Sequence, residues 1–237
     1  GRELRDTLLS LEGRYLPARD YKTYNLLRGY AQMRKILVEW LVEVVEEAKM
    51  KCETLFLAVN YLDRLLSLCE FPRENLQLVG ITAILVASKH EELAPQSVNN
   101  LVIMTDNTYN QADVLSMERS LLTTLGYNLT ALTPLRVLEM LRSLSLRDGS
   151  PFPPPNLPGE LEGVLRRDAW MLASYLLELA LSEFAEVHTP PSVLTAASAF
   201  LAVHSYECAA PADASAGEGA AGAGLTAVAE CVIKCMG

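Results

Sequence analysis

Apolar and polar positions along the chain predict helices throughout. The pattern is clearest from Leu76 to Glu92, where residues 78–88 carry no charge and mix small residues with large aliphatic ones. A helix that is apolar on every side must be buried on every side. Eleven uncharged residues are too few to span a bilayer. We therefore predict that this segment is the central helix of a bundle, and that its charged end, residues 89–92, reaches the surface.

Four further helices are predicted around this segment. They cover Tyr30–Lys49, Glu53–Leu68, Pro95–Met104 and Asn110–Leu125. The first has two apolar faces: one carries Met33, Ile36, Leu37, Trp40 and Val44, and the other carries Val38, Leu41, Val42 and Val45. Five helices joined by short loops within about a hundred residues predict one compact all-α domain over residues 30–130. We expect the second face to pack on the central helix and the first to lie elsewhere.

The rest of the chain predicts a second unit over residues 131–237. A helix begins at Thr133-Pro134, a proline-rich connector covers 147–159, and two more helices cover Glu160–Leu181 and Ser192–His204. The order of long helix, short acidic loop and small-residue helix repeats at an offset of about 115 residues, for which a doubled five-helix domain is the simplest account.

Two weaker segments complete the predicted organisation. Residues 209–224 are mostly Ala and Gly and predict a disordered loop, followed by a short helix from Leu225 to Met236 that docks on the second unit. Residues 1–29 predict a short N-terminal helix and a connecting segment. Because the chain opens on Gly1, we interpret it as a fragment.

Composition and charge exclude some classes of function. The chain has 237 residues, of which 50% are hydrophobic and 21% charged, as in an ordinary globular protein. A formal net charge of −9 counts against nucleic acid as the main ligand, since phosphate binding needs clustered Lys and Arg. Five cysteines, an odd number lying mostly in helical patterns, indicate reduced thiols in an intracellular protein. No signal peptide or membrane span is predicted.

Candidates for metal or catalytic chemistry are few. Cys231 and Cys235 are one helical turn apart, but no His or second Cys pair lies near them in sequence, so buried small side chains are favoured. His90, His188 and His204 show no ligand spacing. With no nucleophile beside a base and no phosphate-binding glycine loop, we expect no metal, no cofactor and no enzyme activity.

Several long motifs resemble a known family. They are MRKILVEWLVEV (33–44), ETLFLAVNYLDRLL (53–66), LQLVGITAILVASKHEE (76–92), MTDNTY (104–109) and VLSMERSLLTTLGYNL (114–129). In order and spacing they resemble the first cyclin box of the mitotic A- and B-type cyclins. Residues 172–203 resemble the second box more weakly, and the chain departs from it after Tyr206. The resemblance implies an all-α fold of two tandem five-helix cyclin boxes preceded by a short N-terminal helix.

The resemblance also implies a function without catalytic residues: binding and activating a cyclin-dependent kinase in cell-cycle control. Lys89 and Glu118 match the family's kinase-contacting lysine and glutamate. The other expected kinase-binding residues are His90, Val86, Leu122, Tyr127 and Leu129. His90 replaces the usual Phe or Tyr, which would retune the contact. Judged without the family, Lys89 and Glu118 are an ordinary pair of surface charges.

Two further sets of residues are implied. Arg34 and Asp63 match the family's internal ion pair. The family's patch for RxL-type substrate and inhibitor peptides is matched by Met33, Ile36, Leu37, Trp40, Glu43, Leu76 and Gln77. Periodicity alone makes the same apolar face part of the core by default. The alternative function is a cyclin-fold transcription factor or adaptor that binds DNA or other proteins. We expect a nuclear and cytoplasmic location, with no membrane and no nucleic acid among its partners.

Overall fold

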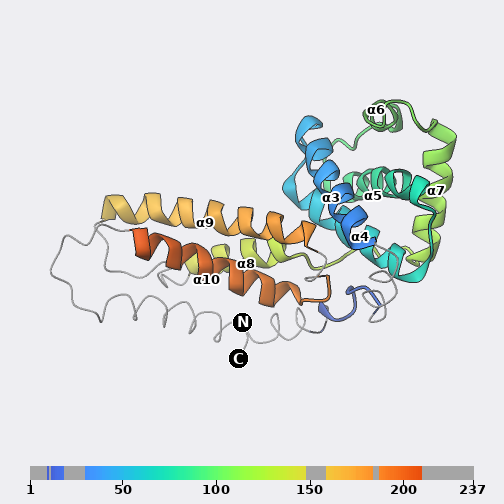
Figure 1. Cartoon of the computed structure of the whole chain (residues 1–237). Helices are drawn as coiled ribbons and strands as arrows, with labels where there is room; N and C mark the ends of the chain where they lie inside the picture. Colours follow the sequence, from blue (N-terminus) through green and yellow to red (C-terminus); the bar gives the residue numbers. More distant parts are fainter. Residues whose placement is uncertain (1–9, 11, 19–29, 148–158, 184–186, 210–237) are drawn as a thin grey trace. The chain divides into compact units, whose positions relative to one another are not determined.

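The computed structural model describes residues 10, 12–18, 30–147, 159–183 and 187–209, which are helical with no strand (Figure 1). The helices are α3 (Tyr30–Glu47), α4 (Cys52–Leu68), the 3-10 helix η1 (Arg73–Asn75), α5 (Leu76–Glu91), α6 (Val98–Met104), α7 (Gln111–Thr124), α8 (Pro134–Arg147), α9 (Gly159–Ser182) and α10 (Pro191–Ala209). The predicted all-α class is confirmed. Most of the Ala/Gly-rich segment, the predicted last helix and the predicted N-terminal helix lie outside the described residues.

The chain divides into two compact units. Among the described residues, the N-terminal unit comprises 12–18, 30–133, 180–183 and 187–189 and contains α3 to α7. Among the described residues, the C-terminal unit comprises 10, 134–147, 159–179 and 190–209 and contains α8, most of α9 and α10. The division falls between Thr133 and Pro134, close to the expected boundary after residue 130. The described part of the expected connecting segment, residues 12–18, groups with the N-terminal unit.

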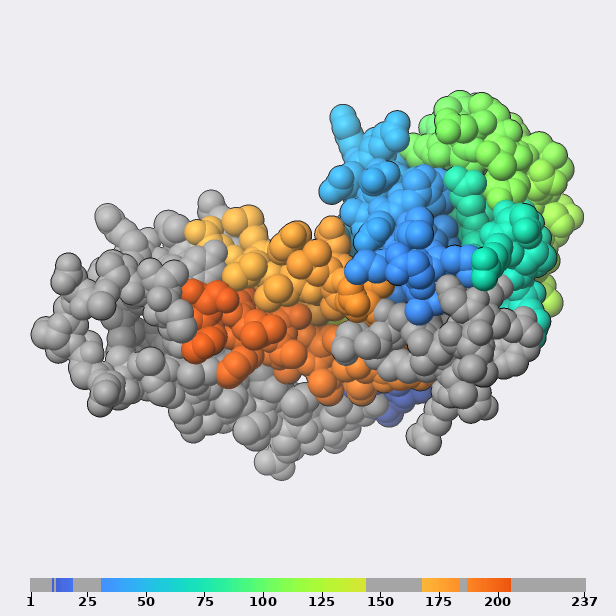
Figure 2. All heavy atoms as spheres, viewed as in Figure 1, coloured from blue at the N-terminus to red at the C-terminus, as the bar shows by residue number. Residues whose placement is uncertain are grey.

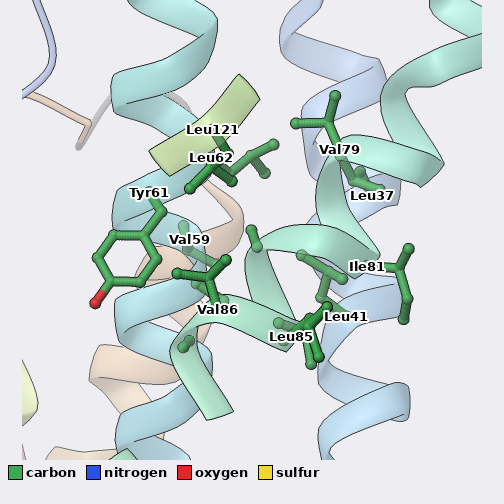
Figure 3. Packing of buried hydrophobic residues seen from close by; sticks show 14 of the residues in the cluster. Leu37, Leu41, Val59, Tyr61, Leu62, Val79, Ile81, Leu85, Val86 and Leu121 are labelled. Carbon is green, nitrogen blue, oxygen red and sulfur yellow. The ribbon is translucent and has the colours of Figure 1, made fainter. Parts of the chain in front are cut away.

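The core of the N-terminal unit surrounds α5. Residues 78–88 of this helix are all buried, and α5 packs against α3, α4 and α7. Leu37 and Leu41 of α3 and Val59 and Leu62 of α4 converge on it (Figure 3). Gly80 permits the close approach of α3, because a Cβ atom there would lie 3.0 Å from Leu37 Cδ1. The apolar run without charge is thus the central helix of this unit.

Side chains at the helix ends fix the loops of the N-terminal unit. Asn110 and Asp113 form a reciprocal capping box at the start of α7. Ser97 Oγ accepts a hydrogen bond from Asn100 N–H and starts α6. The prediction that the fourth helix opens at Pro95 is therefore wrong, because the capping serine, two residues later, sets the first turn.

A buried ion pair joins α3 to α4. Arg34 donates from Nε and Nη2 to the two carboxylate oxygens of Asp63 at 2.7 and 2.8 Å. Arg34 Nη1 also donates to the carbonyl of Leu181 at 2.8 Å. Both charged side chains are less than a tenth exposed. A buried charge needs such complete pairing, so this arginine holds α3, α4 and the end of α9 together.

The C-terminal unit has three helices within the described residues. Its small core contains the side chains of Leu135, Leu138, Ala169, Ala173, Leu177, Ala199, Ala202 and Val203. Thr195 of α10 donates to the carbonyl of Pro134 at 2.8 Å, which ties α10 to the start of α8. Several large apolar side chains remain exposed, namely Met171, Tyr175, Leu179, Val193, Phe200 and Leu201. The five-helix organisation of this unit stays a prediction.

Candidate protein-binding faces

The first candidate face lies where the end of α5 meets the middle of α7. Lys89 lies in the last turn of α5 and Glu118 lies on α7, with Lys89 Nζ 2.6 Å from Glu118 Oε1. The Lys89 side chain is 45% exposed and the Glu118 side chain 12%. A partly exposed pair of this kind contributes at most about 1 kcal/mol to folding. The pair is therefore not needed to hold the fold, and Lys89 stays accessible to a partner.

The other expected kinase-binding residues are not equally exposed. His90 is exposed and Tyr127 is 70% exposed, whereas Leu122 and Leu129 are half-buried against the core. Val86 is only 2% exposed and belongs to the core cluster (Figure 3). The structure therefore corrects the expectation for Val86: it supports the face from beneath, because α5 is covered on all sides up to Ser88.

The backbone after α7 presents Tyr127. Gly126 and Tyr127 have φ angles of +59° and +57°, in the left-handed region that few residues other than glycine adopt. Tyr127 N–H donates to the carbonyl of Leu122 at 2.9 Å, which closes the end of α7. An exposed aromatic ring on such a backbone is uncommon. The loop that follows α7 thus presents one large exposed ring, that of Tyr127.

The charged end of α5 is held in place by the start of α4. Glu92 Oε1 accepts hydrogen bonds from Lys51 N–H at 2.7 Å and from the Thr54 hydroxyl at 2.5 Å. Lys51 Nζ lies 3.1 Å from Glu91 Oε1. The side chain of Lys51, the residue before α4, makes no capping hydrogen bond, and the carboxylate of Glu92 supplies the acceptor at this helix end instead. Its negative charge also interacts favourably with the positive end of the α4 dipole. The two acids thus serve the fold, and Lys89 and His90 remain on the surface.

A second face lies along α3, whose residues form part of the visible surface of the molecule (Figure 2). Ile36 is 57% exposed and Glu43 is exposed. Met33, Trp40 and Gln77 are of intermediate burial, with the Met33 and Trp40 side chains packed against the core on one side. Met33, Ile36, Trp40 and Glu43 recur at i, i+3, i+7 and i+10 on α3, so they form a strip of three apolar side chains that ends in an acid.

Two residues expected on this strip are core residues instead. Leu37 is 7% exposed and Leu76 is 6% exposed. Leu37 faces α5 because the missing side chain of Gly80 leaves room for it. The expectation that Leu37 lies with Met33 and Ile36 away from α5 is therefore wrong. Helical spacing placed it at the boundary between two apolar faces, where the pattern does not decide.

Sequence reasoning missed a polar stripe on α4. Asn60, Arg64 and Ser67 recur at i, i+4 and i+7 on a helix that is otherwise largely buried, and they bind the segment around Tyr15. Asn60 Nδ2 donates to the carbonyl of Tyr15 at 2.9 Å, and Ala18 N–H donates to Ser67 Oγ at 3.1 Å. The signal was present in the sequence as three polar positions on one face.

The described residues offer no metal site, since no group of three or more His, Cys, Asp or Glu side chains comes together there. Cys69 is a free thiol. None of the described helices is long and apolar enough to cross a membrane.

Comparison with known proteins agrees with the motifs. The family model described as "Cyclin, N-terminal domain" matches residues 3–130. Cyclin-A3-1 of Oryza sativa subsp. japonica is 39% identical over 194 residues, which are 82% of this chain and 48% of that protein. The G2/mitotic-specific cyclin C13-1 of Daucus carota is 38% identical over 73% of this chain and 46% of its own length. Cyclin-B2-1 of Arabidopsis thaliana is 37% identical over 72% of this chain and 36% of its own length.

The chain thus spans about half or less of the curated relatives it matches. Among solved structures, a viral cyclin from herpesvirus saimiri matches with a TM-score of 0.59 at 17% identity, covering 86% of each chain. A chain of the CAK complex from Chaetomium thermophilum matches with a TM-score of 0.58 at 16% identity, covering 99% of this chain and 72% of that one. These two structures support the fold alone. From the family model and the relatives at 37–39% identity, the chain belongs to the cyclin family.

Proposed function

We propose that this chain is a regulatory subunit that binds and activates a cyclin-dependent protein kinase, and that phosphoryl transfer is done by the kinase. Membership of the cyclin family supports the proposal. The observation that carries it is the face on which Lys89 and Glu118 lie 2.6 Å apart with Tyr127 exposed. These are residues that the family resemblance assigns to the kinase contact.

The chemistry of this face suits a protein partner. The half-buried Leu122 and Leu129 and the exposed Tyr127 supply apolar area, and Lys89 and Glu118 supply two opposite charges at fixed positions. When a partner covers such charges, removal of one member of a desolvated pair costs about 2–5 kcal/mol of binding free energy. In the free chain the same pair contributes little, so binding and folding can be measured separately.

The test uses a matched pair of variants. Lys89→Ala with Glu118→Ala removes both charges from the face, and kinase affinity should fall at least about tenfold with no loss of folding. Lys35→Ala with Glu183→Ala is the control, because these two residues form another ion pair, at 2.8 Å, elsewhere in the N-terminal unit. Kinase binding and phosphorylation of a protein substrate by the complex are measured for both. Unchanged binding by the double variant contradicts the assignment of this face.

A second part of the proposal is substrate recruitment by the strip on α3. Ile36, Met33 and Trp40 offer apolar surface for one leucine side chain, and Glu43 offers a carboxylate for an arginine. Burial of a leucine contributes roughly 1.5–3 kcal/mol and an exposed Arg–Glu contact roughly 0.2–1 kcal/mol. These two contacts together supply at most about 4 kcal/mol, which corresponds to a Kd of about 1 mM, so RxL-type peptides should bind weakly and with little dependence on salt.

The exposure of Ile36 gives a clean test of the strip. Ile36→Ala should weaken peptide binding, whereas Ile103→Ala, an isoleucine on α6 with nearly the same exposure, should not. Both variants should fold, since each side chain is more than half exposed. Equal peptide affinity of the two variants argues against the strip.

A DNA-binding cyclin-fold factor is the other candidate function. The net charge of −9 counts against it. A salt-dependent shift of a DNA duplex by the purified chain would favour it. As a kinase regulator the chain should occupy the nucleus and the cytoplasm, which imaging of a tagged chain tests.

A further inference from the structure

The loop that follows α7, residues 126–133, is bound along one face of α4. Three side chains of α4 contact it: Glu53, Tyr61 and Arg64, at positions i, i+8 and i+11 on one helix face. Tyr61 donates from its hydroxyl to the carbonyl of Leu129 at 2.8 Å. Arg64 Nη1 donates to the carbonyl of Asn128 at 3.0 Å. The Thr133 hydroxyl lies 2.8 Å from both carboxylate oxygens of Glu53.

Tyr15 contacts both the loop after α7 and Arg64 of α4. Tyr15 is 6% exposed and donates from its hydroxyl to Asn128 Oδ1 at 3.0 Å. The guanidinium carbon of Arg64 lies 5.2 Å from the centre of the Tyr15 ring, a cation–π distance. Asn128 is therefore held through its backbone by Arg64 and through its side chain by Tyr15.

The Tyr61 hydroxyl keeps its proton and so remains the hydrogen-bond donor to the carbonyl of Leu129. Its ring lies in the core cluster while its oxygen points away from the apolar side chains (Figure 3). Burial raises the pKa of the Tyr61 phenol well above its usual range, so that the hydroxyl stays protonated. The carbonyl of Leu129 also accepts a hydrogen bond from Ala131 N–H at 2.9 Å, so it keeps one partner without Tyr61.

We propose that Tyr61, Arg64 and Tyr15 are positioning residues for kinase binding: they fix the loop at Asn128 and Leu129, and so set the orientation in which Tyr127 and Leu129 meet the kinase. The inference rests on the proposed function and adds residues that touch no partner themselves. Tyr127, in its left-handed backbone conformation, lies directly before the residue that Arg64 and Tyr15 hold. A loop fixed in advance binds with a smaller loss of conformational entropy.

The test compares Tyr61→Phe with Thr105→Val in the full chain. Each removes one buried hydroxyl that donates to a backbone carbonyl, at 2.8 Å for Tyr61 and 2.7 Å for Thr105, and Thr105 lies outside the proposed face. Kinase affinity is measured well below the unfolding temperature, so that every variant is folded. We expect Tyr61→Phe to weaken binding about two- to tenfold and Thr105→Val to leave it within about twofold.

A double-mutant cycle separates positioning from general destabilisation. If Tyr61 acts through the loop, Tyr61→Phe has no further effect on affinity once Tyr127→Ala and Leu129→Ala are present. Hydrogen exchange provides a readout without kinase: the amides of Tyr127 and Asn128, which donate to Leu122 and Leu125, should exchange faster in Tyr61→Phe than in Thr105→Val.

The outcomes are distinct. If Tyr127→Ala with Leu129→Ala weakens kinase binding but Tyr61→Phe does not, the positioning role is wrong and the proposed function stands. Additive losses in the cycle, or equal exchange rates in Tyr61→Phe and Thr105→Val, also overturn it. If the wild-type chain binds no cyclin-dependent kinase, the proposed function fails and the inference falls with it. Tyr15→Phe should give a smaller loss of affinity, because Arg64 still holds Asn128.

Discussion

Helices α5 and α10 carry nearly the same sequence signal and have different surroundings. Both are rich in Ala, Val and Leu, and neither has a charged residue in its central turns. Residues 78–88 of α5 are all buried. In α10, by contrast, Val193 and Leu201 are about half exposed. An apolar helix sequence therefore indicates that burial would be favourable, but the helices packed around it determine how much of it is buried.

The difference follows from what packs on each helix. Helix α5 is in contact with α3, α4 and α7, and Gly80 lets α3 approach closely. Helix α10 packs mainly on α8 within the described residues. The four predictions below test this contrast, beginning with the largest expected effect.

The N-terminal unit contains the buried guanidinium of Arg34, and removal of its partner Asp63 should have the largest effect on stability. Asp63→Ala leaves the buried guanidinium of Arg34 without its carboxylate and should reduce the free energy of unfolding by about 3–5 kcal/mol. Urea unfolding measures the loss. In the double variant Arg34→Met with Asp63→Leu no unpaired charge remains, so much of the stability should return. A single variant as stable as the wild type contradicts the buried pair.

Truncation of a core side chain of α5 comes next. Leu85→Ala removes a fully buried side chain and should cost about 2–5 kcal/mol, including the cavity it leaves. The same unfolding experiment gives the value. A loss below about 1 kcal/mol would show that α5 is less tightly enclosed than its burial indicates.

A smaller effect is expected from alkaline pH, and only in the N-terminal unit. Burial raises the pKa of the Tyr61 phenol above its ordinary value of 10.0, so the unfolded chain loses this proton at a lower pH than the folded chain does. The stabilisation is fully present below pH 10 and falls as pH rises above it. The difference between wild type and Tyr61→Phe in unfolding free energy, measured from pH 8 to 11, should shrink at the alkaline end. A difference independent of pH contradicts the buried phenol.

The smallest effect should come from α10. Leu201→Ala removes a side chain that is 51% exposed and should change the free energy of unfolding by less than about 1 kcal/mol. The result is compared directly with Leu85→Ala, since both replace leucine in an apolar helix. A loss as large as that of Leu85→Ala would show that Leu201 is covered in solution.

The sequence predicted the helices well where capping and periodicity agree. The central helix was placed to within one residue, because its uncharged run is bounded by Asn75 and by the charged end at 89–92. Pro95 misled, since a proline often begins a helix but Ser97 makes the capping hydrogen bond.

The candidate sites were predicted less completely. The family resemblance singled out Lys89 and Glu118, which lie 2.6 Å apart, but it did not show that Val86 and Leu37 are buried. Residue spacing does not show which apolar side chain packs against a neighbouring helix. Leu37 packs on α5 because Gly80 has no side chain there. The contacts of Tyr61 and Arg64 with the loop after α7 join positions more than sixty residues apart, which no local pattern reveals.

We have proposed that the face carrying Lys89 and Glu118 binds and activates a kinase. A charge exchange, Lys89→Glu with Glu118→Lys, keeps an ion pair within the chain but reverses both charges toward a partner. The direct measurement is the phosphorylation rate of a cyclin-dependent kinase titrated with the wild-type chain and with this variant, after circular dichroism has shown both to be folded. We expect activation by the wild type and its loss in the folded variant. Equal activation by the two chains would contradict it.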